Sequence, residues 1–309
     1  MISSPAVSIC IATYRRPSML RRLLQSLQAL TFSKVNEPAI TIVVVDNDPS
    51  LSARPVITEF LCKRYTLRYR VERRPGISFA RNTAIEMSRA ADFVAFVDDD
   101  EEVPPRWLDE LLNVQAAFDA DIVAGPVLPH FEVSPPQWMI DGHFFHRRRH
   151  LTGTRLASVG AGNVLIAGGV FHALSPWFDP RFARTGGEDT HFFRRCAVLG
   201  YLVTWADDAV VYESVPPSRL SEAYLISRAR DGANQWTRVD LELCPTLRHL
   251  SSRFAAGIVR VLQGSTVSLL SPALPHEHWL RGQLLLAEGK GNLQAFFGHM
   301  HNAYGLLES

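Results

Sequence analysis

The regular alternation of apolar and amphipathic segments in the first 127 residues constrains the fold most strongly. Segments 6–14, 39–46 and 92–98 are almost wholly apolar, which is typical of strands covered on both faces of a sheet. Short strands are also expected at 67–72 and 121–127. The intervening segments have the apolar spacing of helices, at 17–30, 54–64, 77–90 and 105–118. The alternation predicts an α/β fold, with a mostly parallel sheet flanked by helices.

The second half of the chain is less regular. A turn at 134–139 leads into a short helix, and the glycine-rich segment 158–171 contains one strand. A helix is expected over 186–200 and two short strands over 201–213. From about residue 218 the pattern is helical to the end, so we expect a domain over 1–217 and a helical C-terminal extension over 218–309.

Polar residues follow the predicted strands where the fold rule places ligands, at the carboxyl ends of the sheet. Residues 13–16 read Thr-Tyr-Arg-Arg, residues 46–48 read Asp-Asn-Asp, and residues 98–102 are five consecutive acids. A cation held among these acids is one interpretation of the run, and a solvated acidic loop is the other. Because the acids come directly after an apolar strand, we favour the cation.

Composition excludes several classes of protein. The formal net charge is +1 over 309 residues, which argues against a nucleic-acid partner. The four cysteines (Cys10, Cys62, Cys196 and Cys244) show no CxxC spacing, so we expect reduced thiols and a cytoplasmic protein. We expect no signal peptide, because the N-terminus lacks a basic region and a long apolar run. Segment 255–270 is too polar to span a membrane but allows peripheral docking on its inner face.

Five motifs, in this order and spacing, resemble those of the inverting family 2 glycosyltransferases. They are VSICIATYRRPSMLRRLLQSL, VVVDND, GISFARNTAI, FVDDDEEVPPRWLDEL and GGEDTHFFRRCAVLGY. The likeness spans about residues 6–215, and the segment after it looks like the exopolysaccharide branch, including succinoglycan-type glucosyltransferases. The resemblance implies the Rossmann-like GT-A fold and a nucleotide-sugar donor. It also implies a nucleotide-binding part over about 1–127 and an acceptor part over about 128–217.

The resemblance assigns the acids to a site for Mg²⁺ or Mn²⁺, which would stabilise the departing diphosphate. It places Asp100 on the metal, with Asp98 on the metal and the nucleotide. Side chains two residues apart share one face of an extended segment, so Asp99 should point away and help to hold the loop. Many relatives offer a histidine after the late strand. Here Glu213 lies near that place, and its carboxylate could substitute.

Five further residues are expected to contact the nucleotide or its surroundings. By resemblance, Asp46 accepts a hydrogen bond from the ring N–H of the base, which favours uracil. Thr13, Tyr14 and Arg16 belong to the first nucleotide-binding loop, where Tyr14 could stack on the base. Arg81 would reach the nucleotide or the acidic loop. The ordinary alternatives are a turn role for Asp46 and an exposed helix position for Arg81.

The resemblance also suggests a catalytic base, in the motif GGEDT. Inversion requires a carboxylate that takes the proton of the attacking acceptor hydroxyl. The motif offers Glu188 and Asp189, and the family pattern favours Asp189. Both acids could instead simply cap a helix.

The acceptor and other partners are less constrained. The expected acceptor is a glycan or a lipid-diphosphate-linked oligosaccharide. The basic segment HFFHRRRH at 143–150 could contact such a diphosphate, or it could be a solvated face. The C-terminal helices allow membrane docking, a homodimer contact or an ordinary core.

Two other classes of protein remain as alternatives. A nucleotidyltransferase that makes sugar nucleotides would show a glycine-rich N-terminal loop with a signature lysine, and IATYRRPS stands there instead. An inactive glycan-binding protein would not need Asp98, Asp100 and Asp189 together.

Overall fold

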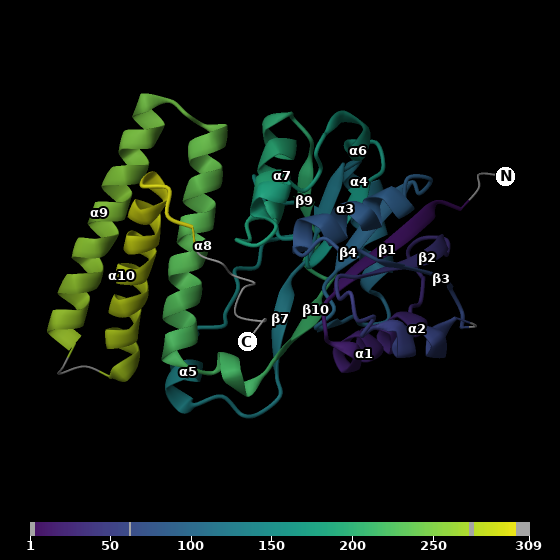
Figure 1. Cartoon of the computed structure of the whole chain (residues 1–309), viewed down its shortest axis with the longest axis horizontal. Helices are drawn as coiled ribbons and strands as arrows, with labels where there is room; N and C mark the ends of the chain where they lie inside the picture. Colours follow the sequence, from purple (N-terminus) through teal and green to yellow (C-terminus); the bar gives the residue numbers. More distant parts are fainter. Residues whose placement is uncertain (1–3, 62, 272–274, 301–309) are drawn as a thin grey trace. The chain divides into compact units, whose positions relative to one another are not determined.

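The computed structural model describes residues 4–61, 63–271 and 275–300 (Figure 1). It contains two compact units, each described by itself below. The sheet unit comprises Met1–Pro129, Arg147–Arg184 and Glu188–Ser214, and the helical unit comprises His130–His146, Thr185–Gly187 and Val215–Ser309. The segment 128–217, which the sequence assigns to the acceptor part, is therefore divided between the two units. Cys62 lies outside the described residues.

A seven-stranded sheet forms the centre of the sheet unit, in the order β3-β2-β1-β4-β8-β6-β9. Only β8 runs against its two neighbours, β4 and β6, while the other adjacent pairs are parallel. The prediction of a mostly parallel sheet flanked by helices is confirmed. The strands are β1 (Ala6–Thr13), β2 (Ala39–Asp46), β3 (Thr66–Val71), β4 (Phe93–Val97), β6 (Ile122–Ala124), β8 (Asn163–Ala167) and β9 (Val203–Trp205).

Helices cover both faces of this sheet because alternate residues of each central strand point to opposite sides. In β1, Ile9 and Ile11 pack in the core that includes α1, α2 and α4, whereas Cys10 packs in the core that includes α3, α6 and α7. Both faces of the sheet are buried, which explains the continuous apolar runs in the sequence. These helices are α1 (Pro17–Gln28), α2 (Arg54–Phe60), α3 (Ile77–Met87), α4 (Trp107–Phe118), α6 (Val170–Ala173) and α7 (Glu188–Val198).

A second, three-stranded sheet has the order β5-β10-β7. The two-residue strand β5 (Glu101–Glu102) pairs antiparallel with β10 (Val211–Val215) and follows the acidic turn directly. The sequence predicted one strand over 121–127. Two strands form instead, because Gly125 and Pro126 separate β6 from β7 (Val127–Phe131).

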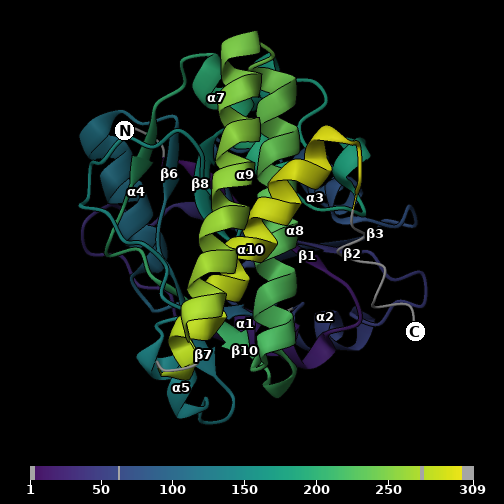
Figure 2. The ribbon, with the colours of Figure 1, turned by 90° about the vertical axis from the view of Figure 1, so that its left-hand side faces the viewer.

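The helical unit contains α5 (Gln137–Asp141), α8 (Glu222–Leu243), α9 (Leu247–Leu270) and α10 (His276–Phe296). Two 3₁₀ turns, Pro180–Phe182 and Pro217–Arg219, also lie in the described part of the chain. Ser221 and Thr246 cap α8 and α9, since each side chain accepts a hydrogen bond from a backbone N–H in the first turn. Helix α10 lies beside both α8 and α9 (Figures 1 and 2).

Glycines let α9 and α10 pack backbone against backbone. A Cβ atom on Gly264 would lie 2.4 Å from the backbone nitrogen of Leu286, and one on Gly289 would lie 2.8 Å from the carbonyl oxygen of Gly257. Within each helix the contacting glycines are seven residues apart, at Gly257 and Gly264 and at Gly282 and Gly289. This spacing keeps them on one face of each helix.

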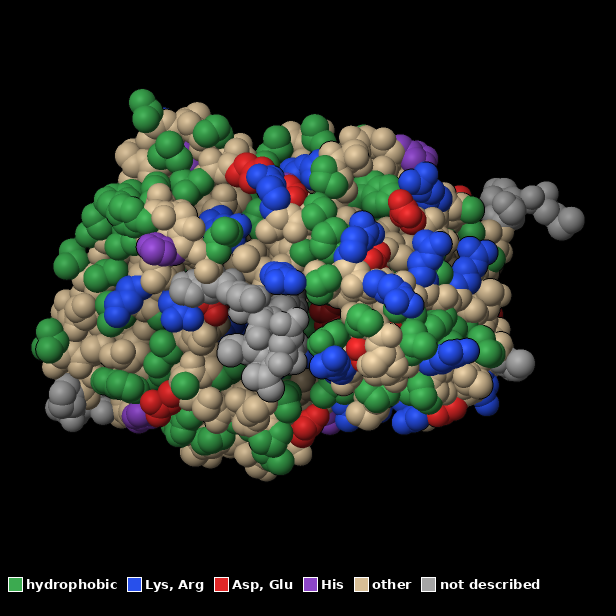
Figure 3. Space-filling view, in the orientation of Figure 1, with side chains coloured by type: hydrophobic (Ala, Val, Ile, Leu, Met, Phe, Trp, Pro, Cys, Tyr) green, Lys and Arg blue, Asp and Glu red, His purple; other side chains and the backbone are tan. Residues whose placement is uncertain are grey.

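The outer face of α9 is apolar. Leu262, Leu269 and Leu270 are 61%, 79% and 69% exposed, and hydrophobic side chains show on the surface over this helix in Figure 3. No described helix is long and apolar enough to cross a bilayer. Whether α9 contacts a membrane surface or a second copy of the chain stays a prediction.

Candidate active site

The acids Asp98–Glu101 form a tight turn at the carboxyl end of β4. The backbone N–H of Glu101 donates to the carbonyl of Asp98 over 3.1 Å, and the N–H of Asp98 donates to the Glu101 carboxylate over 2.8 Å. The prediction that Asp99 faces away from Asp98 and Asp100 assumes an extended segment. That premise is wrong, because the chain reverses here to enter β5, so the faces of Asp98 and Asp100 do not follow from strand alternation.

Residues at the end of β1 and in the loop after it hold one side of this turn. Thr13 Oγ1 donates to Asp99 Oδ2 over 2.7 Å. The Arg16 guanidinium contacts both Asp99 and Asp100, each at 3.1 Å. Burial raises the pKa of Asp99 to about 7, and the Arg16 charge opposes that rise. Asp99 is therefore hydrogen-bonded to the end of β1, and Asp99 and Asp100 both contact Arg16.

Arg81 holds the other side of the turn. It lies in α3, is almost completely buried, and donates to Asp98 Oδ1 over 3.0 Å and to Glu188 Oε1 over 2.5 Å. The expectation of an exposed helix arginine does not describe this side chain. Arg81 joins the acidic turn to the first residue of α7, across 90 positions of sequence from Asp98 to Glu188.

The two acids at the start of α7 have different surroundings. Glu188 is 2% exposed, and its Oε2 atom has no hydrogen-bond partner among the residues that the structure describes. Burial raises the pKa of Glu188 to about 7, against the lowering effect of Arg81. Asp189 is only half-buried, and its Oδ1 atom accepts from the Thr190 N–H over 2.6 Å. Of the two carboxylates, Asp189 is the more accessible to an acceptor.

A glycine segment lies between the acidic turn and Asp189. The antiparallel register places Val97 opposite Asn163, so Gly162 lies opposite Asp98. A Cβ atom on Gly162 would be 2.7 Å from Glu101 Oε1 and 3.0 Å from Asp98 Oδ2, and one on Gly160 would be 3.7 Å from Asp189 Oδ2. The Cα atoms of the two glycines are at most about 7 Å apart. The backbone of 160–162 therefore brings the acids and Asp189 to one site.

The carboxylates around the turn offer the oxygen atoms that a hard divalent cation prefers as ligands. Glu213 in β10 pairs in register with Glu101, and its side chain also forms an ion pair with Arg147. Burial raises the pKa of Glu101 well above its usual range, and the negative charges of Asp98, Asp100 and Glu213 raise it further. These closely spaced carboxylates offer only oxygen ligands, which suit Mg²⁺ or Mn²⁺. The assignment of Asp98, Asp100 and Glu213 as ligands stays a prediction.

Asp46 holds the turn that follows β2. Its side chain is fully buried, and it accepts hydrogen bonds from the N–H groups of Asp48 and Ala53 and from the Tyr69 hydroxyl. A carboxylate can accept about four hydrogen bonds, so these three donors support the turn role, and the contact with a base N–H stays a prediction. Tyr14 is half-buried beside Arg15 and remains a candidate for stacking.

Acidic side chains of the sheet unit pair with part of the basic segment 143–150. Arg147 pairs with Glu213, and Arg149 contacts Asp207 at 2.9 Å. These pairs do not test the predicted contact with a lipid diphosphate.

Comparisons with known proteins identify a family. The model of "Glycosyl transferase family 2" matches residues 8–175, and that of "Glycosyl transferase family group 2" matches residues 93–286. The succinoglycan biosynthesis protein ExoM of Rhizobium meliloti (strain 1021) is 32% identical over 224 residues, which cover 72% of this chain and 71% of that protein. The glycosyltransferase AglE of Haloferax volcanii is 26% identical over 214 residues, covering 67% of this chain and 66% of that protein.

Solved structures support the fold. Residues 1–349 of S. aureus TarS, in complex with UDP-GlcNAc, superpose with a TM-score of 0.54 at 15% identity. The match covers 95% of this chain and 92% of that chain. A second TarS structure, with UDP, gives a TM-score of 0.53 at 16% identity. At these identities the likeness speaks to the fold alone.

Sequence reasoning missed two parts of the site. Glu101 was counted among the acids but given no role, although it is buried and holds the turn. The glycine-rich segment was recognised without a function, although Gly160 and Gly162 approach the acids closely. The sequence did contain a signal for this approach. Gly160 and Gly162 come directly before β8, the strand that pairs with the acidic end of β4.

Proposed function

The chain belongs to glycosyl transferase family 2 and is a glycosyltransferase, and from this premise we propose a metal-dependent inverting hexose transfer. The donor would be a UDP-linked sugar, and the acceptor a glycan or lipid-linked oligosaccharide of exopolysaccharide synthesis. The name of ExoM supports the exopolysaccharide role, and the bound UDP-GlcNAc of TarS supports the donor class. The observation that carries the proposal is the contact of Arg81 with both Asp98 and Glu188. It connects the acidic turn, where the donor would bind, with the start of α7, where the acceptor would be deprotonated.

On the donor side, the nucleotide would lie over the ends of β1 and β4. Parallel strands that end together place Thr13, Tyr14 and Arg16 beside the acidic turn. Arg16 and Arg81 hold three of the acids from opposite sides. The preference for uracil rests on the resemblance to the family and on Asp46, whose carboxylate keeps acceptor capacity beside its three protein donors.

Asp98 and Asp100, with Glu213 beside them, would hold Mg²⁺ or Mn²⁺. When bound, the cation supplies positive charge that stabilises the departing diphosphate. The protein fixes these carboxylates in advance, since Glu101 and Arg16 hold the turn in one shape.

On the acceptor side, Asp189 would take the proton of the attacking hydroxyl. It is the more exposed of the two acids, whereas Glu188 is buried against Arg81. Because the side chain at Gly160 is only a hydrogen atom, a bulky acceptor could approach the Asp189 carboxylate closely. Glu188 would act as a positioning residue that fixes the start of α7 through Arg81. A base held in this way typically contributes about 10²–10⁴-fold to the rate.

The proposal is tested by hydrolysis and transfer assays with a panel of nucleotide sugars. Pure protein is supplied with UDP-, GDP- and CDP-linked hexoses, each with Mg²⁺, Mn²⁺ or chelator. We expect metal-dependent release of UDP, with little activity on the other nucleotides. Full activity in chelator would contradict the metal role, and a preference for GDP-linked sugars would contradict the donor assignment.

A further inference from the structure

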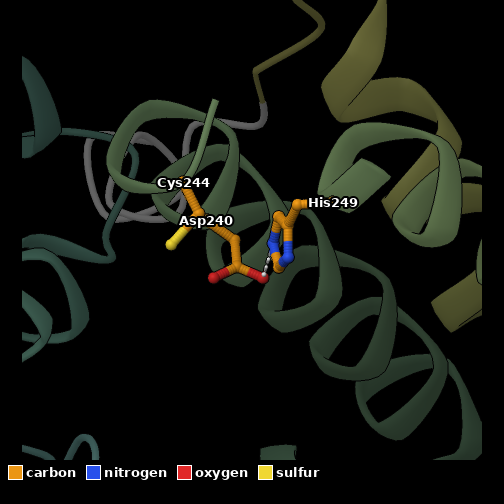
Figure 4. A group of neighbouring side chains, drawn as sticks. All are labelled: Asp240, Cys244 and His249. Atoms are coloured by element: carbon orange, nitrogen blue, oxygen red, sulfur yellow. Dashed lines mark hydrogen bonds and ion pairs between the residues drawn. The ribbon is translucent and has the colours of Figure 1, made fainter. Parts of the chain in front are cut away.

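Three side chains with metal-binding chemistry meet at the corner between α8 and α9, within the helical unit. Asp240 lies in the last turn of α8, Cys244 ends that helix, and His249 lies in the first turn of α9. One ligand atom from each residue lies within 4.8 Å of the other two. In Figure 4 the imidazole of His249 faces the Asp240 carboxylate.

The corner is built in a way that fixes these side chains. The Asp240 side chain is 1% exposed, and its Oδ2 atom lies 3.0 Å from His249 Nε2. The Thr246 side chain caps α9 by accepting a hydrogen bond from the backbone N–H of His249. This bond fixes the backbone of His249 in the first turn of α9. The Cys244 side chain is half-buried.

The donor set selects the kind of metal. A thiolate, an imidazole and a carboxylate together suit zinc, which binds sulfur, nitrogen and oxygen with tetrahedral geometry. Mg²⁺ and Mn²⁺ prefer oxygen ligands, so this group differs from the acidic turn of the sheet unit. Arg253 also forms an ion pair with Asp240. It contacts Oδ2, the oxygen that also faces His249, and would act as the outer partner that ligands of a metal usually have.

We propose that Asp240, Cys244 and His249 bind one zinc ion, with water in the fourth position, and that this ion fastens the end of α8 to the start of α9. The proposed zinc site is separate from the proposed transfer reaction. Zinc binding requires the Cys244 thiol to lose its proton and His249 to be neutral, so affinity should fall as the pH is lowered.

The test uses the full chain, freed of metal with a chelator and titrated with Co²⁺ as a spectroscopic substitute for zinc. One equivalent should produce a thiolate-to-cobalt charge-transfer band and the visible bands of tetrahedral cobalt, and Zn²⁺ should abolish both. Cys244→Ser should remove the charge-transfer band. His249→Ala should weaken binding by more than about 100-fold, beyond the usual cost of losing an outer partner.

Two variants serve as matched controls. His276 also contacts a carboxylate, that of Glu222 at 2.8 Å, but it belongs to no group of three such ligands among the described residues. His276→Ala and Asp100→Ala should therefore keep the cobalt spectrum. In thermal unfolding, Zn²⁺ should raise the Tm of the wild type but not that of Cys244→Ser. Absence of the charge-transfer band in the wild type, or its persistence in Cys244→Ser, would overturn the proposal.

Discussion

Replacement of Arg81 by methionine tests the bridge between the acidic turn and α7. The Arg81 and Glu188 side chains are 7% and 3% exposed, so the ion pair is buried. Methionine keeps much of the volume but leaves the Glu188 carboxylate without its cation. Removing one partner of a buried pair typically costs about 3–5 kcal/mol in the free energy of unfolding. Asp98 adds less to this cost, because its side chain is 42% exposed.

This cost should depend on pH. Burial raises the pKa of Glu188 from 4.5 to about 7, and Arg81 opposes that rise, so the pKa in the variant should be higher still. An acid with a raised folded-state pKa contributes stability that is present below its unfolded pKa and lost as pH rises through the folded value. We therefore expect a large cost of Arg81→Met at pH 8 and a smaller one at pH 5, where Glu188 already holds a proton.

Urea unfolding of the wild type and of Arg81→Met at both pH values measures this difference. The double variant Arg81→Met/Glu188→Gln should recover much of the loss at pH 8, because no buried charge remains. A cost below about 1 kcal/mol at pH 8, the size expected of an exposed pair, would refute the reasoning. So would equal costs at the two pH values.

Three further predictions concern the metal, the helical unit and the product. Asp100→Ala should abolish transfer and metal-dependent UDP binding in calorimetry, whereas Asp99→Asn should keep most activity; equal loss at both positions would contradict the different roles. Gly264→Ala should lower the free energy of unfolding by about 1–3 kcal/mol, because its Cβ would meet the α10 backbone. Gly232→Ala, with open space around the added Cβ, should be neutral or stabilising. An α-linked donor should give a β-glycoside by NMR, and an α-linked product would exclude single-step inversion.

Much of the fold could be predicted from the sequence, because its apolar residues follow the spacing of helices in some segments and form the continuous runs of buried strands in others. Segment 39–46 coincides with β2, and the leucine stripe of 17–30 forms the buried face of α1. Both elements are covered by the core, so local pattern and tertiary packing agree. Where they conflict, as at Gly125–Pro126, the backbone preferences of glycine and proline decide and one predicted strand becomes two.

The candidate site was predicted in its residue types but not in its geometry. The acids at 98–102 and the pair at 188–189 stand out as motifs, yet nothing local shows that Arg81 would join them. The close approach of Gly160 and Gly162 depends on the antiparallel pairing of β8 with β4, a long-range contact. Likewise, two of the hydrogen bonds that Asp46 accepts come from Tyr69 and Ala53, which lie outside its own motif.

The most direct test of the proposed mechanism is the turnover of Asp189→Asn at saturating nucleotide sugar, with UDP affinity measured on the same sample. We predict that kcat falls by about 10²–10⁴-fold while the Kd for UDP and the metal dependence stay as in the wild type. Glu188→Gln, measured in parallel, should keep more turnover than Asp189→Asn. Near-normal turnover of Asp189→Asn beside an inactive Glu188→Gln would contradict the account and make Glu188 the base.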